Sequence, residues 1–537
     1  MQRRRIVLMT VVGMMTVGLF GRADAQETSS APQRGGTYHR LAPANPVTLD
    51  PNRINEVLSR TAAHPMFDRL VQFDKALAIR PALAETWRAS RDGQVWTFKL
   101  RKGVKFHHGR ELTADDVVFS LTRVLDPALK STGASYLAMI SGADAYRAGK
   151  ATQVGGLKAL DRYTVQVELT EPGTPFVLNL AVGYASIVPR DVVQRLGDRF
   201  GTHPVGTGAF KFVEWMPNDR VILAANPEYF EGAPYLDRIH YHILPGDDYD
   251  AAFHAFQRGE LHDSPIPAAV RERVLASNEY TVVRGPHLGL AFLGLRTTAK
   301  PLDDVRVRLA LNYALDRTRI MREVYRDRYP PGIGILPPGI YGYDPRATGY
   351  TYDPAKAAQL LTDAGYPKGQ GLPVLPIWSA RKSTETEAEL NAVVQAFAAD
   401  GVHAEVHYNV DWPSYKSNVY GGTYPVFRMS WYATAPSPED FLGQLLESTS
   451  PDNMTRFRQP AIDGLLRQAC AERDWAKKWP LYQAIERAVL QEAPLIPLYY
   501  ATNERVFRRS VHGMEINALG DPYMPMKKIW LAKDGGG

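Results

Sequence analysis

The sequence predicts an α/β protein, because the periods typical of strands and of helices alternate along the chain. Trp96, Phe98 and Leu100 alternate with polar residues, which is the pattern of a strand buried on one face. Val307 and Leu311 stand four residues apart in a stripe that is typical of a buried helix face. The chain has 537 residues, of which 45% are hydrophobic and 22% charged. This length and composition indicate a globular protein with two or three domain-sized cores.

The first residues predict export from the cytoplasm. Residues 3–5 are arginines, residues 6–20 form an apolar run, and residues 23–25 read Ala-Asp-Ala, a cleavage signal. We therefore predict a signal peptide over residues 1–25, cleaved after Ala25. A membrane anchor, the alternative, is disfavoured because the apolar run is shorter than a bilayer needs. No cysteine stands directly after this run, where a lipid would be attached, so we expect a periplasmic protein without a lipid anchor.

Charge and cysteine content exclude further classes. The net charge is +6, and four arginines and one aspartate among the first 25 residues account for +3 of it. The remaining excess is too small to indicate a nucleic-acid partner or a membrane surface. Cys470 is the single cysteine, which excludes an internal disulfide. The motifs G-x-S-x-G and H-E-x-x-H are absent, so we predict that the protein is not an enzyme and has no cofactor.

The stretch around the first strand predicts a hairpin followed by a helix. Lys102 and Gly103 end the strand, and residues 104–106 have the pattern of a second short strand. Thr113 stands where a helix cap is expected. Asp115 and Asp116 follow it and favour the positive end of the helix.

The remaining elements follow from the same periods. We expect Asp303 to cap the helix that carries the stripe at Val307 and Leu311. Further helices are predicted over residues 57–70, 136–146, 355–364 and 475–490, and strands over residues 165–169, 239–244 and 493–500.

Residues 96–120 read WTFKLRKGVKFHHGRELTADDVVFS. This run resembles the signature of the family 5 extracellular solute-binding proteins, which include the dipeptide and oligopeptide receptors of ABC importers. Residues 204–211 and 301–317 match further blocks of the family. The resemblance therefore extends over nearly the whole mature chain.

The resemblance implies an α/β, two-lobed periplasmic binding protein of the venus-flytrap type, in a large variant with an extra inserted domain. The first lobe would be discontinuous, with residues 26–67, 192–290 and 506–537. The inserted domain would comprise residues 68–191, and the second lobe residues 291–505. Ligand would bind between the lobes.

The implied function is capture of a small ligand, a peptide or another organic solute, and its delivery to an ABC transporter permease. The protein would act as a monomer. One alternative is a non-peptide ligand such as a sugar acid, an opine, or a haem or nickel complex. A second alternative is a sensory or chaperone-like binding protein that works without a transporter.

The resemblance also implies a ligand site around Trp431. In peptide-importing relatives an aspartate three residues after this tryptophan binds the ligand's α-amino group, whereas this chain has Thr434. A threonine cannot neutralise a buried ammonium, and such a one-sided loss costs roughly 2–5 kcal/mol. Arg428, three residues before Trp431, stands where the oligopeptide receptor binds a ligand carboxylate. Its planar fork suits that oxyanion.

Three other positions match ligand contacts in the family. Tyr136 matches a tyrosine of the cleft, and Asn55 and Val57 fall at contact positions, with an amide in place of an acid. Each could equally belong to the core or to the rim of the site. Because two acidic positions are neutral while Arg428 remains, the sequence favours a ligand that is neutral or anionic.

Histidines offer one alternative, a metal site. His240 and His242 stand two apart on a predicted strand and could share one face, as zinc or nickel ligands do. No third ligand is evident nearby in the sequence, so we predict no metal site. His107 and His108 lie within the family signature, where a structural role is favoured.

Overall fold

The computed structural model describes most of the mature chain, namely residues 31–42, 45–54, 57–172, 175–244, 249–346, 349–472 and 474–532. The predicted signal peptide, residues 1–25, lies outside the described residues. Strands and helices are intermixed along the chain, which confirms the α/β class.

A four-stranded sheet organises the first part of the structure. Its order is β1 (Thr37–Ala42), β10 (Arg238–Ile243), β9 (Arg220–Ala225) and β8 (Phe210–Met216). The strand β1 runs parallel to β10, and the other pairs are antiparallel. One face of this sheet is buried in a core that also includes residues of α1 (Val57–Ala63) and α6 (Arg190–Leu196).

A second four-stranded sheet is antiparallel and has its own core. Its order is β4 (Ala84–Ala89), β5 (Val95–Leu100), β7 (Thr164–Glu168) and β6 (Leu157–Asp161). The helix α2 (Ala114–Leu125) packs on it through Val117 and Leu121, which share a core with Phe98 of β5. The short helices α3 (Ala134–Leu137), α4 (Ala143–Arg147) and α5 (Pro175–Asn179) contribute to the same core.

The largest sheet has six strands and is covered by helices on both faces. Its order is β11 (Asp263–Pro265), β16 (Leu495–Arg508), β12 (Tyr280–Leu295), β15 (Val426–Tyr432), β13 (Leu375–Ser379) and β14 (Ala404–Tyr408). One face packs against α9 (Val305–Tyr313), α10 (Arg317–Tyr325), α11 (Pro354–Asp363) and α12 (Thr384–Ala399). The other face packs against α13 (Trp412–Gly421), α14 (Glu439–Leu446), α15 (Pro460–Ala471) and α16 (Trp475–Glu492).

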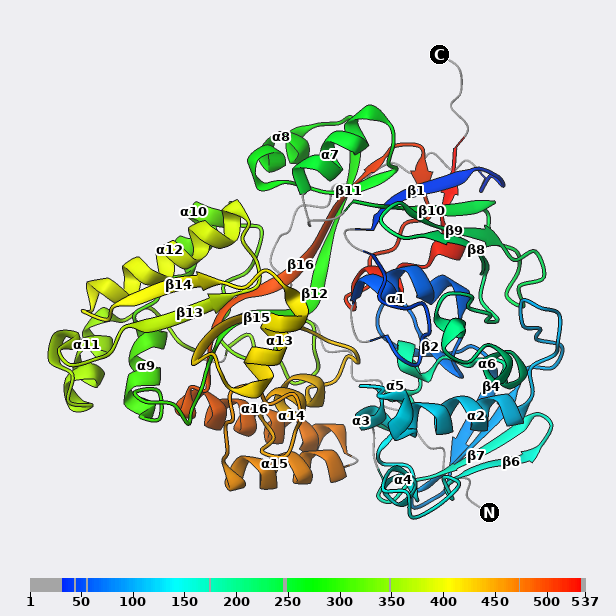
Figure 1. Ribbon diagram of the computed structural model, residues 1–537, viewed down its shortest axis with the longest axis horizontal. Helices are drawn as coiled ribbons and strands as arrows, with labels where there is room; N and C mark the ends of the chain where they lie inside the picture. Colours follow the sequence, from blue (N-terminus) through cyan, green and yellow to red (C-terminus); the bar gives the residue numbers. More distant parts are fainter. Residues whose placement is uncertain are drawn as a thin grey trace, which may run out of the picture. The chain divides into compact units, whose positions relative to one another are not determined.

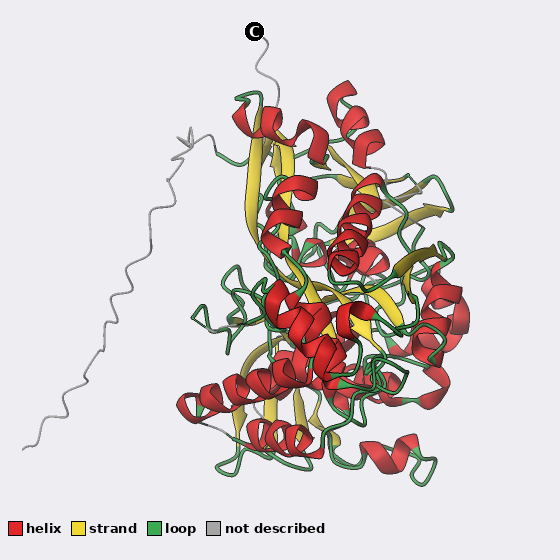
Figure 2. Ribbon diagram, turned by 90° about the vertical axis from the view of Figure 1, so that its left-hand side faces the viewer, coloured by secondary structure: helices red, strands yellow, loops and turns green. Residues whose placement is uncertain are grey.

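The two longest strands, β12 and β16, run antiparallel side by side, as Figures 1 and 2 show. One end of the pair lies in the middle of the six-stranded sheet, flanked by β15. At the other end Val506 shares a core with Leu41 of β1 and with the helices α7 (Tyr249–Arg258) and α8 (Arg271–Ala276). The β12–β16 pair therefore joins the large sheet to the first sheet. The lobe boundaries given above remain predictions.

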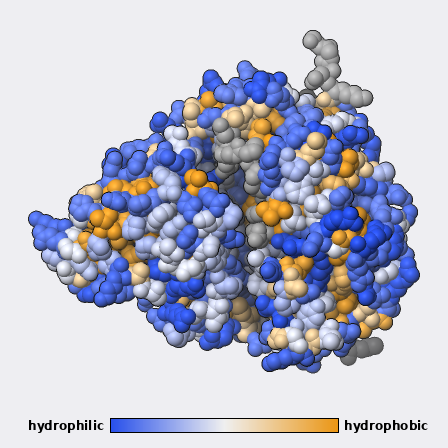
Figure 3. All heavy atoms as spheres, viewed as in Figure 1, coloured by the Kyte–Doolittle hydropathy of each residue, from blue (hydrophilic) through white to orange (hydrophobic). Residues whose placement is uncertain are grey.

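The surface seen in Figure 3 is mainly hydrophilic, and its hydrophobic side chains gather in separate patches. Within the part of the chain that the structure describes, no helix combines the length and the hydropathy needed to cross a bilayer.

Four local predictions are wrong. The predicted helix over residues 136–146 is two short helices, because α3 ends at Leu137 and α4 begins only at Ala143. Residues 104–106 form no strand, because Val104 and Phe106 are buried in the second core while their backbone pairs locally with residues 110–112. The predicted helix over residues 57–70 ends at Ala63 and continues only as a 3-10 turn, His64–Met66. The cap of α9 is Asp304, whose side chain accepts a hydrogen bond from the backbone N–H of Arg306.

The predicted cap of α2 is confirmed, and it forms a buried polar centre. The backbone N–H of Thr113 donates to Asp116 Oδ2 at 3.1 Å. Two guanidinium nitrogens of Arg110 donate to the same carboxylate at 2.9 and 2.7 Å. Asp116 thus satisfies the start of the helix and a neighbouring arginine at once.

We expect Asp116→Ala to lower the free energy of unfolding by about 1–3 kcal/mol, because it removes the cap and one partner of Arg110. Asp115→Ala is the matched control. Asp115 is exposed in the same helical turn, and its loss should change stability by about 0.5 kcal/mol or less. Urea unfolding followed by circular dichroism measures both variants. Equal losses in the two would contradict the role assigned to Asp116.

Candidate functional site

The predicted site residues lie on three separate segments. Arg428 and Trp431 are on β15, in the interior of the six-stranded sheet, and Thr434 follows the end of that strand. Tyr136 is on α3. Val57 is the first residue of α1 and is exposed, whereas Asn55 lies outside the described residues.

A carboxylate that the sequence reasoning missed brings two of these segments together. The hydroxyl of Tyr136 donates to Asp440 Oδ1 at 2.6 Å, and the backbone N–H of Thr434 donates to Asp440 Oδ2 at 2.7 Å. The indole N–H of Trp431 donates to the backbone carbonyl of Asp440 at 2.7 Å. Tyr136, Trp431 and Thr434 therefore all meet at Asp440, the second residue of α14.

Asp440 is an unusual buried acid. Only 3% of it is exposed, and among the described residues no cation forms an ion pair with it. Burial raises the pKa of its carboxyl to about 7, and the hydrogen bonds from Tyr136 and Thr434 only partly offset this. A cationic ligand group would find here a carboxylate with two hydrogen bonds and no ion pair among the described residues, although Arg60 is near enough for its charge to lower the pKa of Asp440.

Aromatic and apolar side chains from distant parts of the chain surround this carboxylate. The rings of Tyr136 and Tyr184 stack with their centroids 5.8 Å apart. Ala435 packs in the same small cluster as Tyr184. The hydroxyl of Tyr523, near the end of the chain, lies 3.5 Å from the backbone carbonyl of Thr434.

A cavity of about 270 Å³ lies beside Phe73 and Tyr523, and its lining does not include Asp440. It shares Phe73 and Tyr523 with the surroundings of Asp440, since Phe73 packs both on that small cluster and on the ring of Tyr523. Its wall carries charges of both signs, from Asp74, Arg80 and other residues. This volume is close to the lower limit of known small-ligand pockets, roughly 300 Å³.

Arg428 lies apart from Asp440 and already has an internal partner. Its Nε donates to Glu389 Oε1 of α12 at 2.6 Å, and its Nη2 donates to the hydroxyl of Tyr499 at 2.9 Å. Both members of the ion pair are buried, with Arg428 5% and Glu389 0% exposed. Burial lowers the pKa of the guanidinium, but the adjacent carboxylate of Glu389 more than reverses this and holds the pKa well above its ordinary value.

The structure corrects the charge argument made from the sequence at two points. Thr434 is neutral, but its backbone N–H donates a hydrogen bond to the carboxylate of Asp440, so an acidic group does lie beside it. Arg428 is charged, but Glu389 balances it. Asp440 stands only six residues after Thr434, so the sequence does show an acid close to the predicted site. The sequence could not show that its side chain turns back toward Thr434.

His107, in the family signature, has the structural role that the sequence predicts. The backbone N–H of Gly206 donates to its Nδ1 at 3.2 Å, and its Nε2 lies 3.0 Å from the carbonyl of Gly208. His107 thus fixes the turn before β8, and its ring is occupied on both sides. His108 contacts Asp191 at 3.3 Å and is partly exposed.

Residues 78–453 match the model of the bacterial extracellular solute-binding proteins, family 5, middle region. The chain belongs to this family. Its structural neighbours are two-lobed periplasmic binding proteins, which confirms the predicted fold type. The members of the family are binding proteins and not enzymes.

Three relatives define the neighbourhood of this solute-binding protein. The dipeptide-binding protein of Escherichia coli strain K12 is 29% identical over 95% of this chain and 97% of its own length. Heme-binding protein A of Haemophilus influenzae is 30% identical over 88% of this chain and 89% of its own. The periplasmic binding protein DppA of Helicobacter pylori, solved with the peptide STSA, superposes with a TM-score of 0.82. It is 27% identical, and the match covers 93% of this chain and 99% of that one.

We expect Arg428→Met to destabilise this solute-binding protein by about 3–5 kcal/mol, because it leaves the buried Glu389 without its partner. The double variant Arg428→Met with Glu389→Gln should recover much of that loss, because it removes both charges. Thermal unfolding measures the stability of the two variants.

The same double variant distinguishes the two roles of Arg428. If the arginine serves the fold, the double variant keeps its affinity for ligands that carry a carboxylate, as titration calorimetry would measure. A stable double variant that loses this affinity would instead support the ligand contact predicted from the sequence.

Proposed function

We propose that this protein is a periplasmic receptor for peptides or peptide-like solutes with a free amino end, which it delivers to the permease of an ABC transporter. The observation that carries the proposal is the carboxylate of Asp440, which is buried, hydrogen-bonded and in no ion pair among the described residues. The names of relatives support a peptide ligand, since one is a dipeptide-binding protein and another was solved with a bound peptide.

The ligand's ammonium group would bind where the hydroxyl of Tyr136 lies in the unliganded protein. This hydroxyl occupies Asp440 Oδ1 at 2.6 Å and reaches there from α3, far from α14 in the chain. An ammonium that replaced this hydroxyl would form a charge-assisted hydrogen bond, which is roughly twice as strong as a neutral one. Thr434 would keep its hydrogen bond to Oδ2 and so hold the carboxylate in position. Tyr136 and Trp431 then serve as walls of the site.

Haem is the second candidate ligand, because one relative at 30% identity is a heme-binding protein. The acidic centre at Asp440 favours a cation over the propionates of haem. Protein that carries the Soret absorption of haem after purification from the periplasm would support the second candidate.

The remaining parts of the function concern address and assembly. Residues 1–25 direct export and are removed after Ala25, no lipid is attached, and the mature chain works as a monomer at the inner membrane. The ligand lies between the lobes predicted from the sequence. Mass spectrometry of the periplasmic protein tests the cleavage site, and under native conditions it also reports a retained ligand.

We expect Asp440→Asn to lower the affinity for free-amino dipeptides at least tenfold, because a buried ammonium loses its counter-charge. An N-acetylated dipeptide should bind the variant and the wild type equally. Glu439→Gln is the matched control: it removes a neighbouring charge that pairs with Lys478 at 3.3 Å and should leave peptide affinity unchanged. Titration calorimetry measures all three proteins. Equal binding of free and acetylated peptide to the wild type would end the proposal.

The pH dependence of binding gives a second reading of the same group. Because the pKa of Asp440 is about 7, its carboxyl must release a proton to bind an ammonium at lower pH. We expect the wild-type affinity to fall up to about tenfold for each pH unit below 7. In Asp440→Asn the affinity should be flat over pH 5.5–7.

Stability of the unliganded protein should show the opposite trend. The folded-state pKa of Asp440 is raised from 3.8 to about 7, so its stabilising contribution is full below pH 4 and is lost as the pH rises through 7. The side chain in Asp440→Asn stays neutral at every pH. At pH 8 we expect this variant to have a higher melting temperature than the wild type and a free energy of unfolding larger by on the order of 3 kcal/mol. The gap should shrink toward pH 4. A gap that is independent of pH would contradict the raised pKa.

A further inference from the structure

Three histidines gather on one face of the first sheet. The parallel register of β1 and β10 sets His39 opposite His240, with His242 two residues further along β10. Alternate residues of the same strands, Tyr38 and Tyr241 among them, point into the core on the other side. The three histidines are half-buried, so water reaches them from the face opposite the core.

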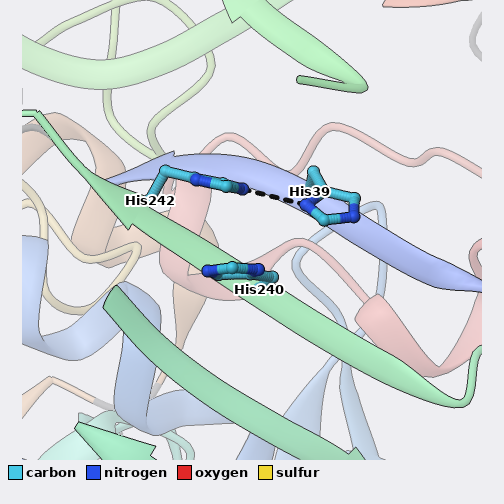
Figure 4. Close-up of side chains that lie close together, drawn as sticks. All are labelled: His39, His240 and His242. Carbon is cyan, nitrogen blue, oxygen red and sulfur yellow. Dashed lines mark hydrogen bonds between the residues drawn. The ribbon is translucent and has the colours of Figure 1, made fainter. Parts of the chain in front are cut away.

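The side chains converge at the spacing of a metal site. His39 Nδ1 lies 2.8 Å from His242 Nε2, the contact drawn as a dashed line in Figure 4. The rings of His240 and His242 stack with centroids 3.9 Å apart, and those of His39 and His240 lie 5.2 Å apart. One nitrogen from each ring lies within 4.8 Å of the other two.

The rings are suited to offer lone pairs rather than protons. Burial lowers the pKa of His39, and burial together with neighbouring histidines lowers the pKa of His240 and brings that of His242 to about 4. Metal coordination requires the uncharged form of imidazole, which these shifts favour. Three clustered imidazoles that stayed charged would repel one another.

A fourth histidine packs against the first. The Nδ1 of His262 accepts a hydrogen bond from the backbone N–H of His39 at 2.9 Å, and the two rings stack with centroids 5.6 Å apart. The hydrogen bond holds the backbone of His39, and the ring of His262 lies beside its side chain. The carboxylates of Asp219, Glu214 and Glu260 act on the cluster from its surroundings, although Arg220 pairs with the first two and Arg258 with the third.

We infer that His39, His240 and His242 form a binding site for a divalent transition-metal ion of the zinc, nickel or copper type. Imidazole nitrogen suits these ions, whereas calcium and magnesium prefer oxygen ligands. In a tetrahedral site with Zn–N bonds of about 2.0–2.1 Å, neighbouring nitrogens stand roughly 3.3 Å apart. His39 and His242 would separate slightly while His240 moves in, and a fourth position would stay open to water or to a group from outside.

The site would act on a different part of the molecule from the peptide site. It would link β1, the edge strand of its sheet, to β10, and so join His39 to His242 across 203 positions of the chain. Its residues are not among those that surround Asp440. The inference therefore does not depend on the proposed peptide function, and each can fail without the other.

The test uses the mature chain, produced without a histidine tag and freed of metal by a chelator. We expect one Zn²⁺ per chain in titration calorimetry, and with Co²⁺ the visible absorption typical of tetrahedral coordination. His39→Ala, His240→Gln and His242→Ala should each weaken Zn²⁺ binding at least tenfold, because each leaves two ligands. His403→Ala, which removes an exposed histidine elsewhere, is the matched control and should bind like the wild type.

A structural readout keeps the inference open to refutation if a variant folds poorly. Excess Zn²⁺ should raise the melting temperature of the wild type and of His403→Ala but not of the three cluster variants. Circular dichroism selects the variants that have folded. Zn²⁺ affinity that is unchanged in two folded cluster variants, or that falls equally in His403→Ala, would overturn the assignment.

Discussion

The pairing of β12 with β16 is the constraint on which the rest of the structure depends. The two strands run antiparallel over residues 280–295 and 495–508 and belong to the six-stranded sheet at one end and to the surroundings of β1 at the other. Their register shifts twice near the middle of the pair, between Pro286 and Leu290 and between Ala291 and Phe292. A proline and a register shift weaken a ladder locally, so bending of this pair would concentrate there. Such a bend offers a physical route for the hinge motion that two-lobed receptors use.

Buried ion pairs hold the end of this strand pair that lies near β1 in place. Arg505 of β16 contacts Asp263 of β11 at 2.6 Å, and Arg40 of β1 contacts the same carboxylate at 3.4 Å. The residue before Arg505, Glu504, accepts two hydrogen bonds from Arg271, both at 2.8 Å. All of these charges are matched. Asp440 has no such ion pair, and burial of a carboxylate without one has a stability cost that a ligand can offset.

Local features of the fold were readable in the sequence, and non-local ones were not. The cap of α2 could be predicted because Thr113 and Asp116 lie within one turn of each other. The failed strand at residues 104–106 had the right apolar pattern, but only the packing of Phe106 in the core reveals its real environment. Glu389, which neutralises Arg428, is 39 positions away and on another element. No spacing rule connects such residues before the sheet is known.

The sequence reasoning missed the third histidine, His39, for the same reason, because it lies on a different strand from His240 and His242. The register of β1 against β10 determines both the contacts in the core and this cluster. Strand alternation sends Tyr38 and Arg40 to one side of β1 and His39 to the other. On the core side Arg40 meets Asp263 at 3.4 Å in a buried ion pair that a slip of one residue would destroy. The ion pair therefore fixes the register, and the register in turn brings His39 beside His240. A cluster that the core already holds in place needs little rearrangement to accept an ion, which is the property expected of a metal site and not of a chance surface group.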